Sequence, residues 1–387
     1  MDVKMTFESL GISNDLCKKL DSINIIDPTK VQLQVIPPLS AGNNLLFQSE
    51  TGTGKTFAYL LPLLKKINPD YPFVQLLIVA PTHELASQIK SQIQLLTDFK
   101  VALLIGGTPI KRQTELLKEK PLIVIGGPAR LVELVYIKKL KLTNLKALVL
   151  DEVDRLISPE LRQETKALSE CVPKDIQFVA CSATITKATE KRIKEELFTK
   201  WQQPLQVNTI LLPPEDILQK KILHIAIYSE SRDKAETLRK VIIAEQPNKA
   251  MIFTSRAEQV EQLASKLLYK KIDCCTLHAK NNKVKRKQAI DNFRNGKCKI
   301  LITSDLSARG LDISGITHII QMDLPSNEDF FIHRAGRTGR AGATGINIVI
   351  GDAYEMRKLA SLEKKLKLII YPKILYKGHL VEPIIDE

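Results

Sequence analysis

The stretch Leu45-Leu46-Phe47-Gln48-Ser49-Glu50-Thr51-Gly52-Thr53-Gly54-Lys55-Thr56 joins a short apolar run to a glycine-rich loop. An amphipathic segment of helix length follows, so the pattern predicts a strand, a turn and a helix. Backbone N–H groups of such a loop, with the helix N-terminus, bind phosphate oxygens. We predict that Lys55 reaches the β- and γ-phosphates and that Thr56 holds Mg²⁺ through its hydroxyl.

The loop departs from the strict phosphate-loop pattern at Ser49, where glycine is usual. The alternative is a glycine-rich turn that precedes a helix and binds nothing. We predict that the whole loop contacts the nucleotide: Ser49, Glu50, Thr51, Gly52, Thr53, Gly54, Lys55 and Thr56.

Short apolar runs alternate with helix-length amphipathic segments along the rest of the chain. Runs without polar alternation, bounded by Gly, Pro or polar residues, are typical of buried parallel strands. The alternation predicts βαβ units and open parallel sheets, an α/β fold. The candidate strands are Leu45–Gln48, Leu76–Ala80, Leu122–Ile125, Ala147–Leu150, Phe178–Ala180, Leu223–Ile227, Ala250–Phe253, Lys299–Thr303, His318–Gln321 and Ile346–Ile350.

A length of 387 residues predicts two domains. The stretch Asn208–Asp216, with its Pro213-Pro214 pair, interrupts the alternation, because paired prolines continue neither a helix nor a central strand. We expect an N-terminal ATP-binding domain at 1–207, a linker at 208–218, a C-terminal domain at 219–370 and a short tail at 371–387.

The chain is basic, with a formal net charge of +14. Residues 1–210 contribute +5 and residues 211–387 contribute +9. Such an excess favours a polyanionic partner, although a solvated basic surface is the alternative. The six cysteines show no CxxC or His/Cys spacing and predict free thiols in a reducing cytoplasm instead of a zinc site. No apolar run reaches the ~18 residues of a membrane span.

Two carboxylates, Asp151 and Glu152, directly follow the apolar run Ala147–Leu150. Groups at the carboxyl end of a strand lie where α/β proteins bind ligands. We predict that Asp151 contributes to a Mg²⁺ site and that Glu152 orients or deprotonates the attacking water. The alternative is an acidic turn without a function.

Arginines recur every three residues in His333-Arg334-Ala335-Gly336-Arg337-Thr338-Gly339-Arg340. Glycines between them let the backbone approach a ligand closely. Arginines supplied by a second domain neutralise charge on a transferring phosphoryl group. The alternatives are a solvated basic turn and a simple RNA-binding patch.

As an ordered set, these motifs resemble those of the DEAD-box RNA helicases, from Phe7 to about Ile370. The resemblance implies two tandem RecA-like domains, each a parallel sheet flanked by helices, joined by a short linker. It implies ATP and Mg²⁺ as ligands and RNA as the partner. It also implies RNA-stimulated ATP hydrolysis coupled to local unwinding or remodelling of short RNA duplexes.

The resemblance assigns roles residue by residue. It implies that Phe7 stacks on adenine and Gln32 hydrogen-bonds its edge, and that Gly310 and Asp312 lie at the nucleotide, with Asp312 on the ribose. It implies catalytic roles for Arg337 and Arg340 as arginine fingers and for His333 as a bridge to the magnesium-site carboxylates. The residues implied to couple ATP state to RNA grip are Asp154, Ser182 and Thr184. Those implied to contact RNA are Pro81, Thr82, Gly106, Gly107, Arg130, Ser255, Arg286, Ser304 and Asp305.

Several RNA-side positions depart from the family pattern. His83 stands where the family has arginine, Gly127 and Ala129 alter the family's TPGR, and Lys283 replaces a glutamine within the basic run Lys280–Lys287. Val153 changes DEAD to DEVD without loss of an acid. Our hypothesis is that RNA grip has shifted toward the second domain; neutral drift of a solvated face is the alternative.

Two other functions are alternatives. An RNA clamp or chaperone with weak ATP turnover is favoured by the altered RNA positions and disfavoured by the intact nucleotide motifs. A DNA translocase is disfavoured by Phe7 with Gln32. We expect a monomeric, cytoplasmic protein with no membrane contact.

Overall fold

The structure, a computed structural model, describes residues 5–49, 53–199, 205–211, 221–278, 281–308, 311, 313–325, 328–339 and 343–383. Six predicted site residues therefore lie outside the described residues: Glu50, Thr51, Gly52, Gly310, Asp312 and Arg340. The chain divides into two compact units, Met1–Pro213 and Pro214–Glu387. No described helix is long and apolar enough to cross a membrane.

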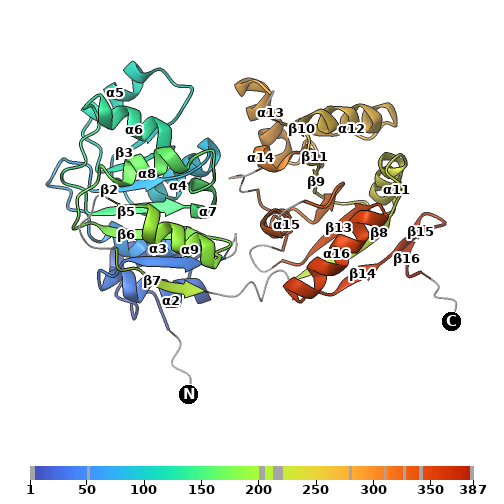
Figure 1. Cartoon of the computed structure of the whole chain (residues 1–387), viewed down its shortest axis with the longest axis horizontal. Coiled ribbons are helices and arrows are strands. Elements are labelled where there is room, and N and C mark those ends of the chain that lie inside the picture. The colour runs from blue at the N-terminus through green and yellow to red at the C-terminus, as the bar shows by residue number, and fades with distance from the viewer. Residues whose placement is uncertain are drawn as a thin grey trace. The chain divides into compact units, whose positions relative to one another are not determined.

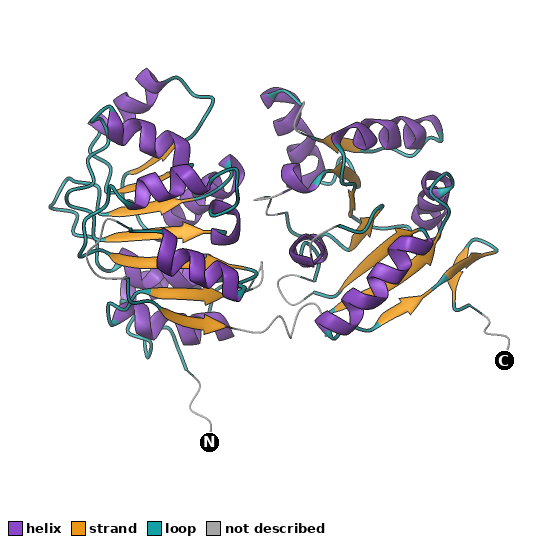
Figure 2. Ribbon diagram, in the orientation of Figure 1, coloured by secondary structure: helices purple, strands orange, loops and turns teal. Residues whose placement is uncertain are grey.

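The first unit is built on a parallel sheet whose described strands run β3-β4-β2-β5-β6-β1-β7 (Figures 1 and 2). The strands are β1 (Leu45–Gln48), β2 (Leu76–Val79), β3 (Val101–Leu104), β4 (Ile123–Gly126), β5 (Ala147–Asp151), β6 (Gln177–Ser182) and β7 (Asn208–Leu211). The helices are α1 (Asn14–Ser22), α2 (Lys30–Ser40), α3 (Lys55–Leu64), α4 (His83–Leu96), α5 (Ile110–Lys118), α6 (Pro128–Tyr136), α7 (Val153–Leu156), α8 (Arg162–Ser169) and α9 (Lys187–Glu196).

Helices cover both faces of this sheet, and each face has its own apolar core. Leu45 and Phe47 of β1 point into the core beneath α1–α4, whereas Leu46 between them points into the core beneath α6–α9. Since successive side chains of a strand point to opposite faces, strands buried on both sides are apolar throughout. This is why the inner strands appear in the sequence as unbroken apolar runs.

The second unit repeats the plan with the described order β10-β11-β9-β12-β13-β8-β14. Its strands are β8 (Ile222–Tyr228), β9 (Ala250–Phe253), β10 (Cys275–Leu277), β11 (Ile300–Thr303), β12 (His318–Gln321), β13 (Gly345–Gly351) and β14 (Ile370–Pro372). Its helices are α11 (Lys234–Glu245), α12 (Ala257–Tyr269), α13 (Lys283–Arg294), α14 (Asp305–Ala308), α15 (Glu328–Ala335) and α16 (Ala353–Leu366). A separate antiparallel pair follows, β15 (Ile374–Tyr376) and β16 (His379–Val381).

The structure confirms the predicted α/β fold with two parallel sheets, and each of the ten predicted runs overlaps an inner strand. Six described strands were missed. Four of them, β3, β7, β10 and β14, are the described edges of the two large sheets, and β15 and β16 form the separate antiparallel pair. Edge strands are buried less continuously, as the alternating burial of β3 and the largely exposed β7 show. Their sequences therefore lack an unbroken apolar run.

Two predicted boundaries are corrected by these edge strands. Asn208–Leu211, predicted as the start of the linker, form β7 and pair in parallel with β1. The predicted tail at 371–387 includes most of β14, which pairs with β8, and both strands of the β15–β16 hairpin. In both places a short, half-exposed strand completes the structure beyond the last long apolar run.

Candidate functional site

In the first unit, the predicted nucleotide and RNA residues occupy separate halves of one sheet edge. Ser49, Asp151 and Ser182 end or follow β1, β5 and β6, which are neighbours in the sheet. Thr82, Gly106 and Arg130 follow β2, β3 and β4, which form the other half. Because all these strands are parallel, their carboxyl ends meet at the same edge. The strand order thus sorts the predicted sites into two groups.

The phosphate loop ends at Gly54, whose φ of +92° precedes the first residue of α3, Lys55. A Cβ built there would lie 2.6 Å from Nε2 of Gln32, so glycine is required both by conformation and by space. Gln32 is 1% exposed; its Nε2 donates to the Gly54 carbonyl (3.2 Å) and its Oε1 accepts from the Thr29 N–H (2.9 Å). At the loop's start, the Ser49 and Thr53 hydroxyls share a 2.5 Å hydrogen bond.

Substitution of Gly54 by alanine tests this close approach. Gly42 has nearly the same φ, +91°, but a Cβ added there would have no neighbour within 4 Å, so Gly42→Ala is a matched control. Both variants carry the left-handed backbone cost of about 1–2 kcal/mol in free energy of unfolding. We expect only Gly54→Ala to weaken ATP binding, by about tenfold or more, because Gln32 must move. Equal ATP affinities in the two variants, measured by fluorescent-nucleotide titration, would contradict this.

Asp151, at the end of β5, is 3% exposed and accepts three hydrogen bonds. Its Oδ1 accepts from the Glu152 N–H (2.9 Å) and the Cys181 thiol (3.2 Å), and its Oδ2 accepts from the Tyr59 hydroxyl (2.9 Å). A buried carboxylate is stable only when hydrogen-bonded or paired, and these donors satisfy that need. The Asp151 side chain is therefore fixed in orientation.

The two side chains that donate to Asp151 remain protonated at neutral pH. Burial, and then the negative charge of Asp151, raise the pKa of the Tyr59 hydroxyl well above its ordinary value. The same two causes, in the same order, raise the pKa of the Cys181 thiol. Neither group has to ionise for the arrangement to persist, so both act as permanent donors.

Glu152 follows in a left-handed conformation, with φ 52° and ψ 54°, and is 6% exposed. Non-glycine residues adopt this conformation at a cost, and such positions cluster at functional sites. The turn sends the chain from β5 directly into α7, where the buried Val153 packs in the core on that face. Val153, the residue that changes DEAD to DEVD, is thus a core residue.

Asp154, on α7, joins the end of β6. Its Oδ1 accepts from the Ser182 hydroxyl (2.7 Å), and the Ser182 oxygen accepts from the Thr184 N–H (3.2 Å). The hydroxyl oxygen of Thr184 is buried and has no hydrogen-bond partner within the described structure. The three residues predicted to couple ATP state to RNA grip are thus brought together.

Phe7 and Gln32, the two residues predicted to contact adenine, lie in different surroundings. Gln32 lies beside the phosphate loop, where it donates to Gly54. Phe7 is 4% exposed and packs in the apolar core beneath α1–α4. Its predicted stacking on a base stays a prediction.

The predicted RNA residues of the first unit lie on three adjacent loops. Thr82 caps α4, where its hydroxyl accepts from the Leu85 N–H (3.2 Å). Arg130 donates to the Thr108 carbonyl (2.7 Å) and pairs with Glu133 (2.8 Å), which ties α6 to the loop that contains Gly106 and Gly107. Both glycines are exposed, as is His83. Their accessibility is compatible with contact to an RNA backbone.

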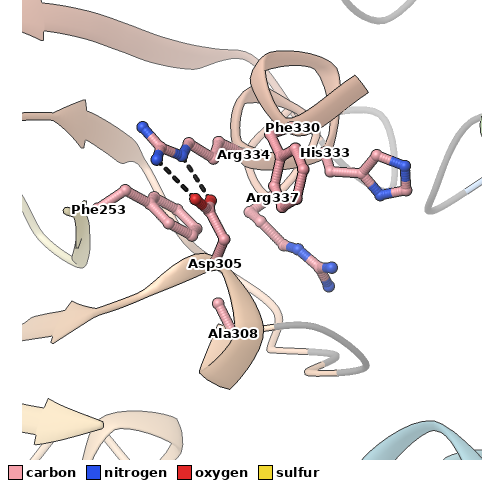
Figure 3. Close-up of a pocket in the computed structure, with 7 residues that line it drawn as sticks. All are labelled: Phe253, Asp305, Ala308, Phe330, His333, Arg334 and Arg337. Carbon is pink, nitrogen blue, oxygen red and sulfur yellow. Dashed lines mark hydrogen bonds and ion pairs between the residues drawn. The ribbon is translucent and has the colours of Figure 1, made fainter. Parts of the chain in front are cut away.

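The corresponding edge of the second unit is organised around Arg334 of α15, which is 1% exposed (Figure 3). Its guanidinium binds both carboxylate oxygens of Asp305 (2.6 and 2.7 Å), donates to the carbonyl of Asp323 (2.8 Å), and lies 5.4 Å from the ring centroid of Phe253. Asp323 in turn accepts from the Ser255 N–H (2.7 Å). One buried arginine thus joins the loops after β9, β11 and β12.

The predicted RNA residues Ser255, Ser304 and Asp305 follow β9 and β11, the half of this sheet that corresponds to β3-β4-β2. Arg286 of α13 donates to the Ser307 carbonyl (3.1 Å), which ties α13 to α14, the short helix after β11. The carboxylate of Asp305 is engaged by Arg334, so its predicted contact with RNA competes with an internal ion pair.

The predicted catalytic residues His333 and Arg337 line the same small pocket as Arg334 (Figure 3). Arg337 is buried and donates to the Leu311 carbonyl. In Figure 3 its guanidinium points away from Asp305, on the other side of the helix end from Arg334. Arg334 and Arg337 therefore have different surroundings within the unit.

Comparison with known proteins decides the family. A family model described as DEAD/DEAH box helicase matches residues 29–193, and one described as helicase conserved C-terminal domain matches residues 233–342. DEAD-box ATP-dependent RNA helicase CshC of Bacillus cereus is 36% identical over 357 residues, covering 92% of this chain and 90% of the relative. The chain belongs to the DEAD-box RNA helicases.

Other relatives agree with this membership. A probable ATP-dependent RNA helicase of Bacillus subtilis, YfmL, is 35% identical and covers 91% of this chain and 92% of its own. Among solved structures, S. cerevisiae Dbp5 bound to RNA and ADP BeF3 has a TM-score of 0.86 at 27% identity and covers 96% of both chains. Mss116p bound to ssRNA and AMP-PNP has a TM-score of 0.84 at 26% identity, covering 97% of this chain and 80% of that one. The chain is an ATP-dependent RNA helicase with RecA-like domains.

Three residues of this DEAD-box helicase escaped sequence reasoning: Tyr59, Cys181 and Arg334. The sequence holds a signal for Tyr59, which follows Lys55 by four residues and so shares its face of α3. Cys181 directly precedes the Ser182 motif, and Arg334 lies inside the arginine motif. Their partners, however, come from distant segments, and no spacing rule connects them.

Proposed function

We propose that this helicase hydrolyses ATP at the edge formed by β5, β6 and β1, with Glu152 as the residue that orients or deprotonates the attacking water. The observation that carries the proposal is the buried Asp151, held by three hydrogen bonds beside Glu152 at the end of β5. The phosphate loop follows β1 two strands away in the same sheet. Lys55, 8% exposed at the start of α3, would neutralise phosphate charge there.

The residues at this edge fit a magnesium ion. Thr56 supplies a hydroxyl and Asp151 a carboxylate, which are the oxygen ligands that Mg²⁺ takes in proteins, and Mg²⁺ retains several waters. Within the described structure Oδ2 of Asp151 accepts one hydrogen bond, so it keeps acceptor capacity for such a water. Bound Mg²⁺ would neutralise charge on the phosphate oxygens. Thr56 and Asp151 would hold and orient it.

We also propose roles in ATP hydrolysis for residues of the second unit. We assign Arg337 and Arg340 as the arginines that stabilise developing phosphoryl charge, His333 as a bridge to the magnesium-site carboxylates, and Asp312 as the ribose contact. The ordered motifs of the family support these assignments. RNA would be held by its backbone and 2′-hydroxyls, with little base reading, because the predicted contact residues other than Asp305 offer backbone groups, hydroxyls and arginines.

A steady-state ATPase assay with single-stranded RNA or single-stranded DNA tests this function. Strong stimulation by RNA and none by DNA would support it. ATP binding without RNA-stimulated turnover would instead favour the RNA clamp, and stimulation by DNA would favour the translocase. A monomer in the cytoplasm remains our expectation; all six cysteines are free.

We further propose that basic residues of α13 strengthen RNA binding by the second unit. Lys285 and Lys287 are exposed on this helix, near Arg286. Reversal of both to glutamate is expected to lower RNA affinity tenfold or more, and to reduce the slope of log affinity against log salt by roughly 0.7 per lost phosphate contact. The helix itself should tolerate the change, because Lys285 is at N3 behind the Asn282 cap, where glutamate is favourable.

Lys358 and Lys364 on α16 provide the matched control, since they are also exposed lysines of the second unit. Their reversal alters net charge equally. If both double variants lose affinity equally, the effect belongs to overall charge, and the assignment to α13 is wrong.

A further inference from the structure

The hydroxyl of Tyr59 lies between the two residues assigned to the magnesium site. It donates to Asp151 Oδ2 at 2.9 Å and also hydrogen-bonds the Thr56 hydroxyl. Tyr59 is on α3, one turn after Lys55, so the helix that carries the phosphate-binding lysine also carries this bridge. Its ring is fully buried in the core of the first unit.

Cys181 contacts the same carboxylate from the other side. Its thiol donates to Asp151 Oδ1 at 3.2 Å, and its residue is paired in register with Asp151 across β5 and β6. The next residue, Ser182, donates to Asp154. The thiol is fully buried.

These contacts leave the Asp151 carboxylate little freedom. A carboxylate has about four acceptor positions, and three are filled by Tyr59, Cys181 and the Glu152 N–H. The remaining one is on Oδ2, beside the Tyr59 hydroxyl that also touches Thr56. The orientation of that free lone pair is thus determined by side chains from α3 and β6.

We propose that Tyr59 and Cys181 are positioning residues that hold the Asp151 carboxylate, and through Tyr59 also Thr56, in the orientation that binds the hydrated magnesium ion. The inference rests on the proposed assignment of Asp151 and Thr56 to that ion. Groups that orient metal-binding carboxylates set metal affinity without touching the metal. A further consequence is that α3, β5 and β6 are joined at one carboxylate.

Four variants of the full-length chain test the inference. Tyr59→Phe removes only the hydroxyl, Cys181→Ala removes the thiol, and Cys181→Ser keeps a donor. Cys171→Ala is the control, because that thiol donates to the Ala167 carbonyl in α8. For each, Mg²⁺ is titrated into the protein with fluorescent ADP at equilibrium, and the half-saturating Mg²⁺ concentration is measured. Steady-state ATPase over the same Mg²⁺ range and the thermal midpoint of the nucleotide-free protein are measured alongside.

We expect the half-saturating Mg²⁺ concentration to rise about tenfold in Tyr59→Phe. In Cys181→Ala it should rise about threefold, because a thiol is the weaker donor. Cys181→Ser and Cys171→Ala should stay near the wild-type value. At saturating Mg²⁺, the ATPase kcat of Tyr59→Phe should return to within about threefold of wild type. The variant keeps Asp151 and Thr56 and changes only their orientation.

An Asp151→Asn variant distinguishes the positioning roles of Tyr59 and Cys181 from the assignment of Asp151 to the magnesium site. If Asp151→Asn raises the Mg²⁺ requirement but Tyr59→Phe and Cys181→Ala do not, the positioning roles are wrong while the magnesium site stands. If Asp151→Asn also has no effect, the magnesium assignment itself is wrong. A lower thermal midpoint with weaker ADP binding at every Mg²⁺ concentration would show a merely structural role and overturn the inference.

Discussion

The Glu152→Gln variant is expected to lose RNA-stimulated ATP hydrolysis by about 10²–10⁴-fold while it still binds ATP. The amide matches the carboxylate in size, so the left-handed turn between β5 and α7 is kept, as is the Glu152 N–H bond to Asp151. What would be lost is the carboxylate that we propose to orient or deprotonate the attacking water. The measurement is kcat with saturating single-stranded RNA, together with ATP affinity from fluorescent-nucleotide competition.

Glu119→Gln is a suitable control for this variant, because Glu119 is exposed at the end of α5, away from the nucleotide half of the sheet edge. It should keep the wild-type rate. A Glu152→Gln rate within tenfold of wild type would remove Glu152 from the reaction, and the water would then need another base.

The Arg334→Ala variant is expected to destabilise the second unit by about 3–5 kcal/mol, the usual effect of removing one partner of a buried ion pair. Asp305 and Asp323 would be left without the cation that compensates them. For a unit of this size the loss corresponds to a fall of roughly 6–20 °C in its thermal midpoint, measurable by calorimetry on the full chain. RNA binding should fall with it, because Ser255 and Asp305 lose their shared anchor.

Arg334→Lys separates charge from geometry. Lysine keeps the positive charge but cannot form the bidentate hydrogen bonds to Asp305 or place a planar guanidinium against the ring of Phe253. We expect a thermal midpoint between those of wild type and Arg334→Ala. An unchanged midpoint in Arg334→Ala would mean that the cluster relaxes without cost, and Arg334 would lose its structural role.

Sequence patterns predict the inner strands of the two sheets well and the edge strands poorly, and the reason is their burial. β9 and the first three residues of β1 are buried on both faces, so these residues are apolar and the signal is strong. β7 and β14 cover one edge of each sheet and are largely exposed, so almost any residue is tolerated and the signal disappears. An edge strand is determined by its pairing with the neighbouring strand, and this pairing cannot be recognised from the local sequence.

The same distinction applies to the site. Lys55, Asp151 and Ser182 belong to recurring motifs, so the sequence alone could nominate them as candidate site residues. The residues that support them could not be nominated in this way: Tyr59 meets Asp151 across 92 positions of sequence, and Arg334 meets Asp305 across 29. Such pairings follow from strand order, which single-sequence reasoning recovers only in outline. Only the start of the predicted linker was misplaced, and for the same reason: residues 208–211 pair with β1, while the boundary between the two units lies within 208–218.

The position of β1 in its sheet also has a consequence for synthesis of the chain. β1 ends at residue 48, but its two neighbours, β6 and β7, are residues 177–182 and 208–211. At the usual ~5–20 residues per second, the ribosome therefore extends the chain for several seconds before β1 has any strand to pair with. Until then its backbone groups have no neighbouring strand to pair with. The strand that introduces the phosphate loop is thus among the last inner strands to be secured as the nascent protein folds.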